Sequence, residues 1–283
     1  MYQFCYEKAI IPTTRTEYVP VNLPQNVDDL LQAQRVIHRC IDVINLIKYV
    51  EDAYEDYLLF KQALKKPETM SDIRLERKAR SYFLEFSVFL EHWKKYMVSR
   101  DKSKQFNEFF NSKTHEAFDN SDNYALATML RNHIAHSSIL IRSKFWGEGH
   151  YDVGCNANAL LQDKNFNKTK KEIIKRQPAQ MISLSPIMKE SLEKLKEIHL
   201  AFLNFDFGAE EKKAASKVMT AIQFLKDNGL TGRKWFIINT VKTYFTIYSP
   251  NDTPMETVPA TEFYPFRWEE YEPAIQFILS CND

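Results

Sequence analysis

The sequence DIRLERKARSYFLEFSVFLEHWKKYMV, residues Asp72–Val98, contains no glycine or proline. Its apolar side chains recur at helical spacing, and the stripe comprises Leu75, Ala79, Phe83, Phe86, Phe89 and Leu90. The segment belongs to a longer stretch, residues 68–146, that also lacks both residues. Long helices with short polar connections account for such a stretch, because glycine and proline are the strongest helix breakers.

Further helices are expected on both sides of this segment. Asn26 is a suitable N-cap for a helix from about residue 27 into the 60s, either continuous or broken once. Helices are also predicted over residues 103–118 and 124–136, separated by the polar turn 119–123. Four helices with short links predict an antiparallel helical bundle.

The remainder of the chain has a mixed pattern. Residues 145–151 resemble a hairpin turn, and the lysine-rich residues 163–177 predict a solvated helix. Ser185 is the expected N-cap of a helix that reaches about Phe205. The last elements expected are a helix over 209–226, strands over 235–238 and 244–248, and a terminal helix.

Three parts are therefore predicted along the chain. Residues 1–25 form an extended N-terminal arm or edge strand, residues 26–207 a helical domain, and residues 208–283 a small α+β C-terminal domain. The expected fold class is mainly α: an antiparallel helical bundle with a small α+β C-terminal appendage.

Composition excludes several classes of protein. Of the 283 residues, 44% are hydrophobic, which supports a folded core, and the net charge of +1 excludes nucleic-acid binding through overall basicity. The cysteines form no CxxC pair, so neither a cysteine zinc site nor a disulfide framework is expected. With no signal peptide or membrane-spanning segment predicted, we expect a cytoplasmic protein without membrane contact.

The motif Arg131–His136, RNHIAH, is the strongest candidate site. On a helix, Arg131 and His136 lie about 140° apart and flank one polar face, and Asn132 is an i, i+4 neighbour of His136. The helix is expected to pack by its opposite face, which carries Leu126, Leu130 and Ile134.

This motif resembles that of the HEPN superfamily, in which an arginine precedes a histidine by four to six intervening residues, often with a polar residue after the arginine. The resemblance covers about residues 26–205. It implies a metal-independent endoribonuclease of a prokaryotic toxin or phage-defence type, without a cofactor, that leaves 2′,3′-cyclic phosphate ends. It also implies that Arg131 and His136 are catalytic with support from Asn132. The implied partners are RNA, a second copy of the chain that completes a composite site, and an antitoxin or sensor protein.

The basic residues after the motif have two open interpretations. Lys168, Lys170 and Lys171 are candidate contacts for RNA phosphates. A lysine-rich run is also typical of a solvated helix face without a ligand.

Two other functional classes have to be compared with a ribonuclease. The chain is alternatively a non-catalytic helical binding or partner module, in which His136 interacts with the helix dipole and Arg131 forms a surface salt bridge. A metal enzyme is disfavoured, because no HxxxH or HExxH pair occurs and no Asp, Glu or Cys lies within a turn of His133 and His136. His133 is interpreted as scaffold.

Overall fold

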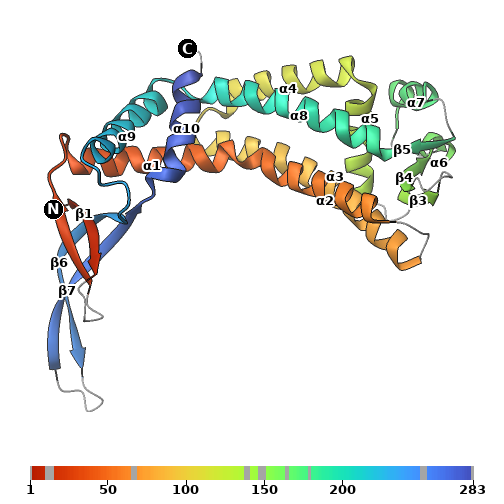
Figure 1. Cartoon of the computed structure of the whole chain (residues 1–283). Helices are drawn as coiled ribbons and strands as arrows, with labels where there is room; N and C mark the ends of the chain where they lie inside the picture. Colours follow the sequence, from red (N-terminus) through yellow and green to blue (C-terminus); the bar gives the residue numbers. More distant parts are fainter. Residues whose placement is uncertain are drawn as a thin grey trace. The chain divides into compact units, whose positions relative to one another are not determined.

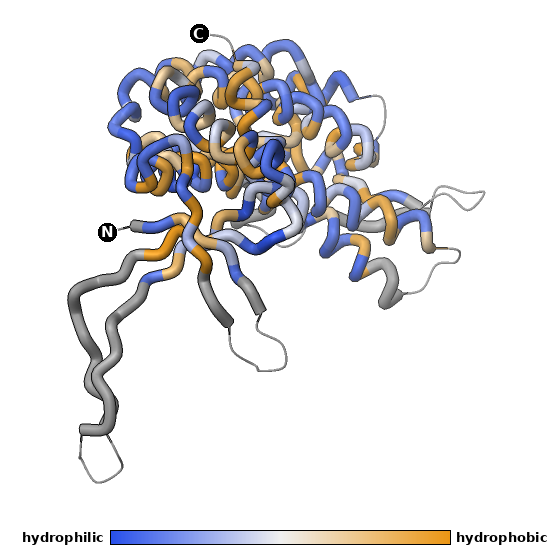
Figure 2. The backbone as a smooth tube through the Cα atoms, turned by 60° about the vertical axis from the view of Figure 1, so that its left-hand side comes forward, coloured by the Kyte–Doolittle hydropathy of each residue, from blue (hydrophilic) through white to orange (hydrophobic). Residues whose placement is uncertain are grey.

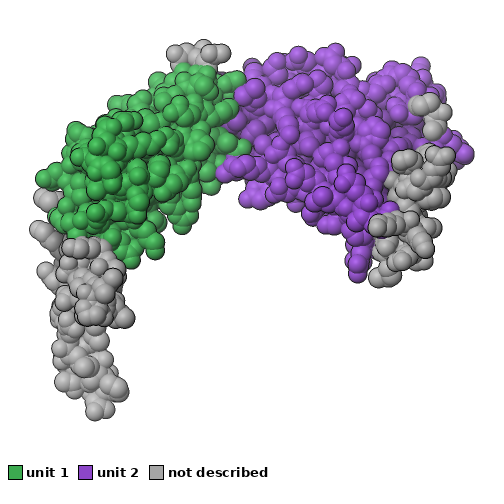
Figure 3. Space-filling view, viewed as in Figure 1, with its two compact units in different colours: residues 1–44, 204–283 green, residues 45–203 purple. Residues whose placement is uncertain are grey.

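The computed structural model describes residues 2–9, 16–64, 69–136, 141–145, 151–162, 166–177, 180–248 and 254–281. This part of the chain is mainly helical and contains small antiparallel sheets, which confirms the predicted class at that level. None of its helices is both long and apolar enough to cross a lipid bilayer. The chain forms two compact units, residues 45–203 and residues 1–44 with 204–283 (Figure 3).

The unit formed by residues 45–203 is largely helical (Figure 1). Its long helices are α2 (Leu46–Ala63), α3 (Thr69–Ser99), α4 (Ser103–Asn120), α5 (Asp122–His136) and most of α8 (Leu184–Asp206). Short helices α6 (Ala157–Gln162) and α7 (Lys168–Lys175) accompany a sheet of order β3-β4-β5, made of Ile141–Phe145, Tyr151–Asn156 and Met181–Ser183. The predicted helices of this region are thus present. Strands β3 and β4 pair antiparallel with Phe145 opposite Tyr151, and the expected turn between them lies outside the described residues.

Helix α3, which contains the segment Asp72–Val98, is the central element of this unit. It contacts α2, α4, α5, β3 and β4. Its buried side chains recur at helical spacing on one face, which contains the predicted stripe, and the opposite face is exposed. Trp93 lies with its ring centre 5.3 Å from that of Phe202 on α8 and 6.0 Å from that of Phe106 on α4. Aromatic packing therefore joins α3, α4 and α8.

The start of α8 differs from the prediction. The helix begins at Leu184, so Ser185 lies inside its first turn and is not its N-cap. The hydroxyl of Ser185 instead donates to a carboxylate oxygen of Asp152 at 2.6 Å. The Ser185 side chain, which the local pattern assigned to a helix cap, therefore binds a carboxylate from a distant part of the sequence.

The other unit combines both ends of the chain. A sheet of order β2-β1-β6-β7 contains Tyr2–Ala9 as β1, Thr16–Val21 as β2, Trp235–Tyr248 as β6 and Pro254–Phe266 as β7. All neighbouring strands are antiparallel. Three helices complete the unit: α1 (Val27–Ile44), α9 (Ala209–Asp227) and α10 (Trp268–Ser280).

This grouping differs from the three predicted parts. The expected arm, residues 1–25, supplies two strands of a sheet that residues 208–283 complete, and residues 27–44 belong to the same unit. Strand β7 was not predicted, because its three prolines argue against a strand in the sequence. These prolines are tolerated because β7 is an edge strand, where a missing N–H leaves no ladder bond unmade. Strand pairing between distant segments leaves no local signal.

The core of this unit lies between its sheet and its helices. The rings of Phe4 on β1 and Trp235 on β6 are stacked with centres 4.7 Å apart. Buried Gln34 on α1 donates to the carbonyl of Pro265 at 2.6 Å and to the hydroxyl of Tyr271 at 2.9 Å, which links α1 to β7 and α10. Hydrophobic and hydrophilic positions alternate along the helices of the chain, as expected when each buries one side (Figure 2).

Candidate functional site

Helix α5 carries the candidate motif and is firmly held at its start. Ser121 is its N-cap, since its hydroxyl accepts from the backbone N–H of Tyr124 at 3.0 Å. The same hydroxyl donates to Glu190 on α8, and the side-chain amide of Asn123 donates to the other carboxylate oxygen of Glu190 at 2.7 Å. The expected cap cluster before the motif therefore fixes α5 to α8.

The burial of α5 is greater than the sequence predicts. Leu126 and Leu130 are buried as expected for the apolar face. The helix is also buried at Tyr124, Ala125, Ala127 and Met129. Its first turns are thus enclosed on nearly all sides, and the expectation of a helix packed by one face alone is wrong for residues 124–130. Exposure increases at Arg131, where the side chain is half-buried.

Arg131 occupies an unusual environment for a guanidinium. Its Cζ atom lies 5.6 Å from the centre of the Phe86 ring on α3, within the range of a cation–π interaction. Its Nε atom is buried and has no hydrogen-bond acceptor among the described residues. Burial lowers the pKa of Arg131, and the nearby Tyr124 and Glu91 only partly oppose this effect. No carboxylate in the described part of the chain forms an ion pair with it.

The remaining residues of the motif lie on the last turn and a half of α5. The helix is continuous to His136, which gives Asn132 and His136 the helical backbone that the prediction assumes. Their side chains, and that of His133, are outside the described residues. The site is therefore defined by the backbone of α5 and by the environment of Arg131.

The three candidate lysines lie on α7, which packs against α5. Lys168 is exposed, and Lys170 and Lys171 are half-buried. Asn167 caps this helix by accepting from the backbone N–H of Lys170 at 3.0 Å.

Helix α7 is also tied to α5 by an ion pair at its C-terminal end. Arg176 directs two nitrogens at the carboxylate of Asp122, with its Nε 2.9 Å from one oxygen. Asp122 precedes Arg131 by nine residues, which is about 13.5 Å along a helix. The lysine-rich helix is thus anchored at the end of α5 opposite to the motif.

A second polar cluster joins α2 to β4, β5 and α8, and no pattern in the sequence predicted it. The carboxylate of Asp152 accepts from the hydroxyls of Tyr57 at 2.5 Å, Ser185 at 2.6 Å and Ser183. The ammonium of Lys61 lies 2.7 Å from the Ser185 hydroxyl and 3.3 Å from the carboxylate. These residues lie far apart in the sequence, so only the tertiary structure brings them together.

The chemistry of this cluster favours a structural role. Burial raises the pKa of Asp152, but the hydrogen bonds from the three hydroxyls and the charge of Lys61 outweigh it, so the pKa is lowered overall. The carboxylate is therefore ionised and keeps the Lys61 ammonium paired. Because Ser185 donates to Asp152 and accepts from a charged amine, it is not arranged as an activated nucleophile.

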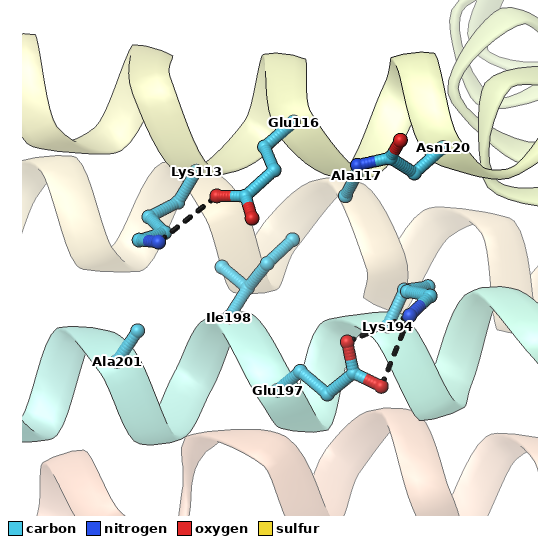
Figure 4. A pocket seen from close by; sticks show the side chains of 8 residues that line it. All are labelled: Lys113, Glu116, Ala117, Asn120, Lys194, Glu197, Ile198 and Ala201. Atoms are coloured by element: carbon cyan, nitrogen blue, oxygen red, sulfur yellow. Dashed lines mark hydrogen bonds and ion pairs between the residues drawn. The ribbon is translucent and has the colours of Figure 1, made fainter.

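A small pocket of about 150 Å³ lies between α4 and α8 (Figure 4). Its charged side chains are paired along their own helices, with 2.9 Å between Lys113 and Glu116 and 2.8 Å between Lys194 and Glu197. The pocket therefore presents no unpaired charge for a ligand. Within the described residues, no group of three His, Cys, Asp or Glu side chains is placed to hold a metal ion.

Comparison with known proteins gives no relative. No protein-family model, no curated protein and no solved structure matches this chain.

Proposed function

We propose that the protein is a metal-independent endoribonuclease of the HEPN type, with the active site at the C-terminal end of α5. The observation that carries this proposal is the environment of Arg131, a half-buried guanidinium with no carboxylate partner among the described residues. A buried polar group without a hydrogen-bond partner lowers the stability of the fold by about 1–3 kcal/mol, so we expect a functional reason for its presence. A ligand anion, such as a phosphate of RNA, supplies that partner.

The contrast with Arg39 on α1 supports this interpretation. The side chain of Arg39 is 34% exposed and lies 3.5 Å from Glu210 and 3.3 Å from Glu211. The charge of Arg39 is thus balanced by protein carboxylates, although its Nε, like that of Arg131, has no acceptor among the described residues. Arg131 is also half-buried, but it packs on the face of Phe86 and forms no ion pair with the nearby Glu91. An arginine held in this way is available for an anion that is not part of the chain.

The proposed reaction uses the nucleophile that RNA itself supplies. The 2′-hydroxyl attacks the adjacent phosphorus, and the bond from phosphorus to the 5′-oxygen breaks. A histidine removes the 2′-hydroxyl proton, and a second proton donor protonates the leaving 5′-oxygen; histidine suits both roles because its reference pKa is about 6.5. Arg131 stabilises the negative charge that develops on the phosphate oxygens. Asn132 orients His136 or holds a phosphate oxygen.

A second copy of the chain completes this chemistry in the proposal. Two motifs facing one another provide two His136 side chains, one as base and one as acid, and two Arg131 guanidinium groups. The biological setting proposed is a toxin or phage-defence protein controlled by an antitoxin or sensor. Lys168, Lys170 and Lys171 are candidates for contacts with more distant phosphates.

One observation favours the alternative, a non-catalytic helical binding module. The guanidinium of Arg131 already packs on Phe86, and α5 is largely buried over residues 124–130, which are features of a structural arginine. In that case Arg131 stabilises the fold and does not contact RNA.

Cleavage of RNA in excess EDTA distinguishes the two proposals. The wild-type protein is expected to cut RNA, and Arg131→Gln to lose at least about a hundredfold in rate while it remains folded. The control is Lys95→Gln, an exposed cation on α3, which is expected to cleave normally. Equal cleavage by Arg131→Gln and wild type would contradict the role assigned to Arg131.

A further inference from the structure

A groove with a volume of about 370 Å³ lies between α2 and α3. Its lining combines three cations with one carboxylate and an aromatic ring: Ala53, Asp56, Phe60, Arg74, Arg77, Lys78 and Ser81. It lies within a single compact unit of the chain, residues 45–203.

The charges of this groove are not balanced among the described residues. Lys78 pairs with Asp56 at 2.7 Å, so the carboxylate among the described lining residues is already neutralised. Arg74 and Arg77 are exposed, and no described residue forms an ion pair with either of them. The groove therefore carries a net positive charge from two arginines that stand one helical turn apart.

The spacing of these arginines suits a polyanion. Residues i and i+3 of a helix have Cβ atoms about 5–6 Å apart, so Arg74 and Arg77 can each reach a different phosphate of one strand. Phe60 is half-buried on the facing helix and offers an aromatic ring at the same groove. Paired cations beside an aromatic side chain are the elements of single-stranded nucleic-acid binding, in which phosphates contact the cations and a base stacks on the ring.

The groove also has a defined relation to the proposed active site. Ser81, which lines it, precedes Phe86 by five residues on α3, about 7.5 Å along the helix axis. Phe86 is the ring over which Arg131 lies. Ser81 and Phe86 are also about 140° apart around the helix, so the groove and Arg131 lie on different faces of α3, and an RNA strand that contacts both must pass around this helix.

We propose that the groove between α2 and α3 binds a single-stranded segment of the RNA substrate, with Arg74 and Arg77 on neighbouring phosphates and Phe60 against a base. This inference rests on the proposed ribonuclease function, because that function supplies the RNA. It adds a binding site that is separate from α7 and from the motif.

The experiment is equilibrium binding of a labelled 12-nucleotide single-stranded RNA, followed by fluorescence anisotropy. All proteins carry His136→Ala so that the RNA is not cut. The double variant Arg74→Gln/Arg77→Gln is expected to raise Kd about tenfold, and to reduce the slope of log K against log salt by about 1.4, since each single-strand phosphate contact contributes about 0.7. Phe60→Leu is expected to raise Kd about tenfold through the loss of stacking.

The matched control is Lys95→Gln/Lys104→Gln, which removes two exposed cations from α3 and α4 and changes the net charge equally. It is expected to shift Kd less than twofold. An equal effect of both double variants, an unchanged slope, or no RNA binding at all would overturn the inference. If the double variant Arg74→Gln/Arg77→Gln loses binding of a poly-glutamate peptide but keeps binding of RNA, the occupant of the groove is an acidic protein segment. This result would also overturn the inference.

The two proposals fail separately. If RNA binding depends on Arg74 and Arg77 but the protein with an intact motif does not cleave RNA, the ribonuclease proposal is contradicted and the groove proposal stands. If the protein cleaves RNA but its RNA affinity does not change when these two arginines are replaced, the groove proposal is contradicted and the ribonuclease proposal stands.

Discussion

At the scale of single residues, the informative groups are those whose charge is either fully satisfied or conspicuously unsatisfied. Asp152 is the satisfied case, with three hydroxyl donors and an ammonium around one carboxylate. Arg131 is the unsatisfied case, with an aromatic face and no described carboxylate. The first arrangement is typical of a structural residue, and the second is the one on which the proposed ribonuclease function rests.

The Asp152 cluster predicts a pH-dependent contribution to stability. Because its folded pKa is lowered, Asp152 stabilises the fold fully above its unfolded pKa of about 3.9, and this contribution is lost as the pH falls through the folded pKa. Asp152→Asn is expected to cost about 2–4 kcal/mol at pH 7, since it leaves Lys61 and three hydroxyls poorly paired. Urea unfolding at pH 7 and near pH 3 measures both effects, and the difference from wild type should shrink at the lower pH.

The control for this measurement is Asp52→Asn on α2. Asp52 is exposed, so its replacement is expected to change the free energy of unfolding by no more than about 0.5 kcal/mol. A loss from Asp152→Asn as small as this, or one that does not depend on pH, would show that the cluster contributes little to the fold.

At the scale of elements, aromatic contacts join α3, α4 and α8. Phe202 on α8 is fully buried and lies with its ring centre 5.3 Å from that of Trp93, 4.9 Å from that of Phe106 and 5.4 Å from that of Phe110. Removing this ring is expected to leave a cavity at the junction of three helices.

Phe202→Ala is accordingly predicted to destabilise the protein by about 3–5 kcal/mol. Leu200→Ala, two residues earlier on the same helix, is the matched control, since Leu200 is 49% exposed and its loss should cost far less. Chemical denaturation of both variants tests the prediction. Similar costs for the two would mean that the aromatic junction is not a principal source of stability.

How well each element could be predicted follows from where its stabilising contacts lie. Helices α3, α4 and α5 were expected from periodicity and from a cap cluster, all of which are local. Strand β7 was missed because its prolines hide an edge strand, and Ser185 was misassigned because a distant carboxylate holds its hydroxyl. The Asp152 cluster was missed for the same reason, while the position of Arg131 on a helix was correctly predicted.

At the scale of the whole molecule, the division of the chain depends on long-range pairing. Strand β1 pairs with β6, so that Phe4 lies opposite Ile237, more than two hundred residues later. No local pattern in residues 1–25 specifies such a partner, which is why the sequence suggested only an extended arm or edge strand. A local turn is different: Gly229, which follows α9, has a φ of 64°, and glycine adopts this conformation without strain.

The proposed composite site predicts that activity depends on self-association. The rate of RNA cleavage per molecule is expected to fall on dilution below the dimer dissociation constant, because a monomer supplies only one Arg131 and one His136. Light scattering over the same concentrations gives the dimer fraction, and the two curves should coincide. A protein that is monomeric throughout and has constant specific activity would contradict the composite site.

The most direct test of the central claim is the chemistry of the cut ends. Incubation of the wild-type protein with RNA in excess EDTA is predicted to give 2′,3′-cyclic phosphate and 5′-hydroxyl ends. His136→Ala, and a substrate with a single 2′-deoxy substitution at the cleaved position, are both predicted to abolish that cut. No cleavage by the wild type, cleavage that requires a divalent cation, or unchanged cleavage by His136→Ala would contradict the account.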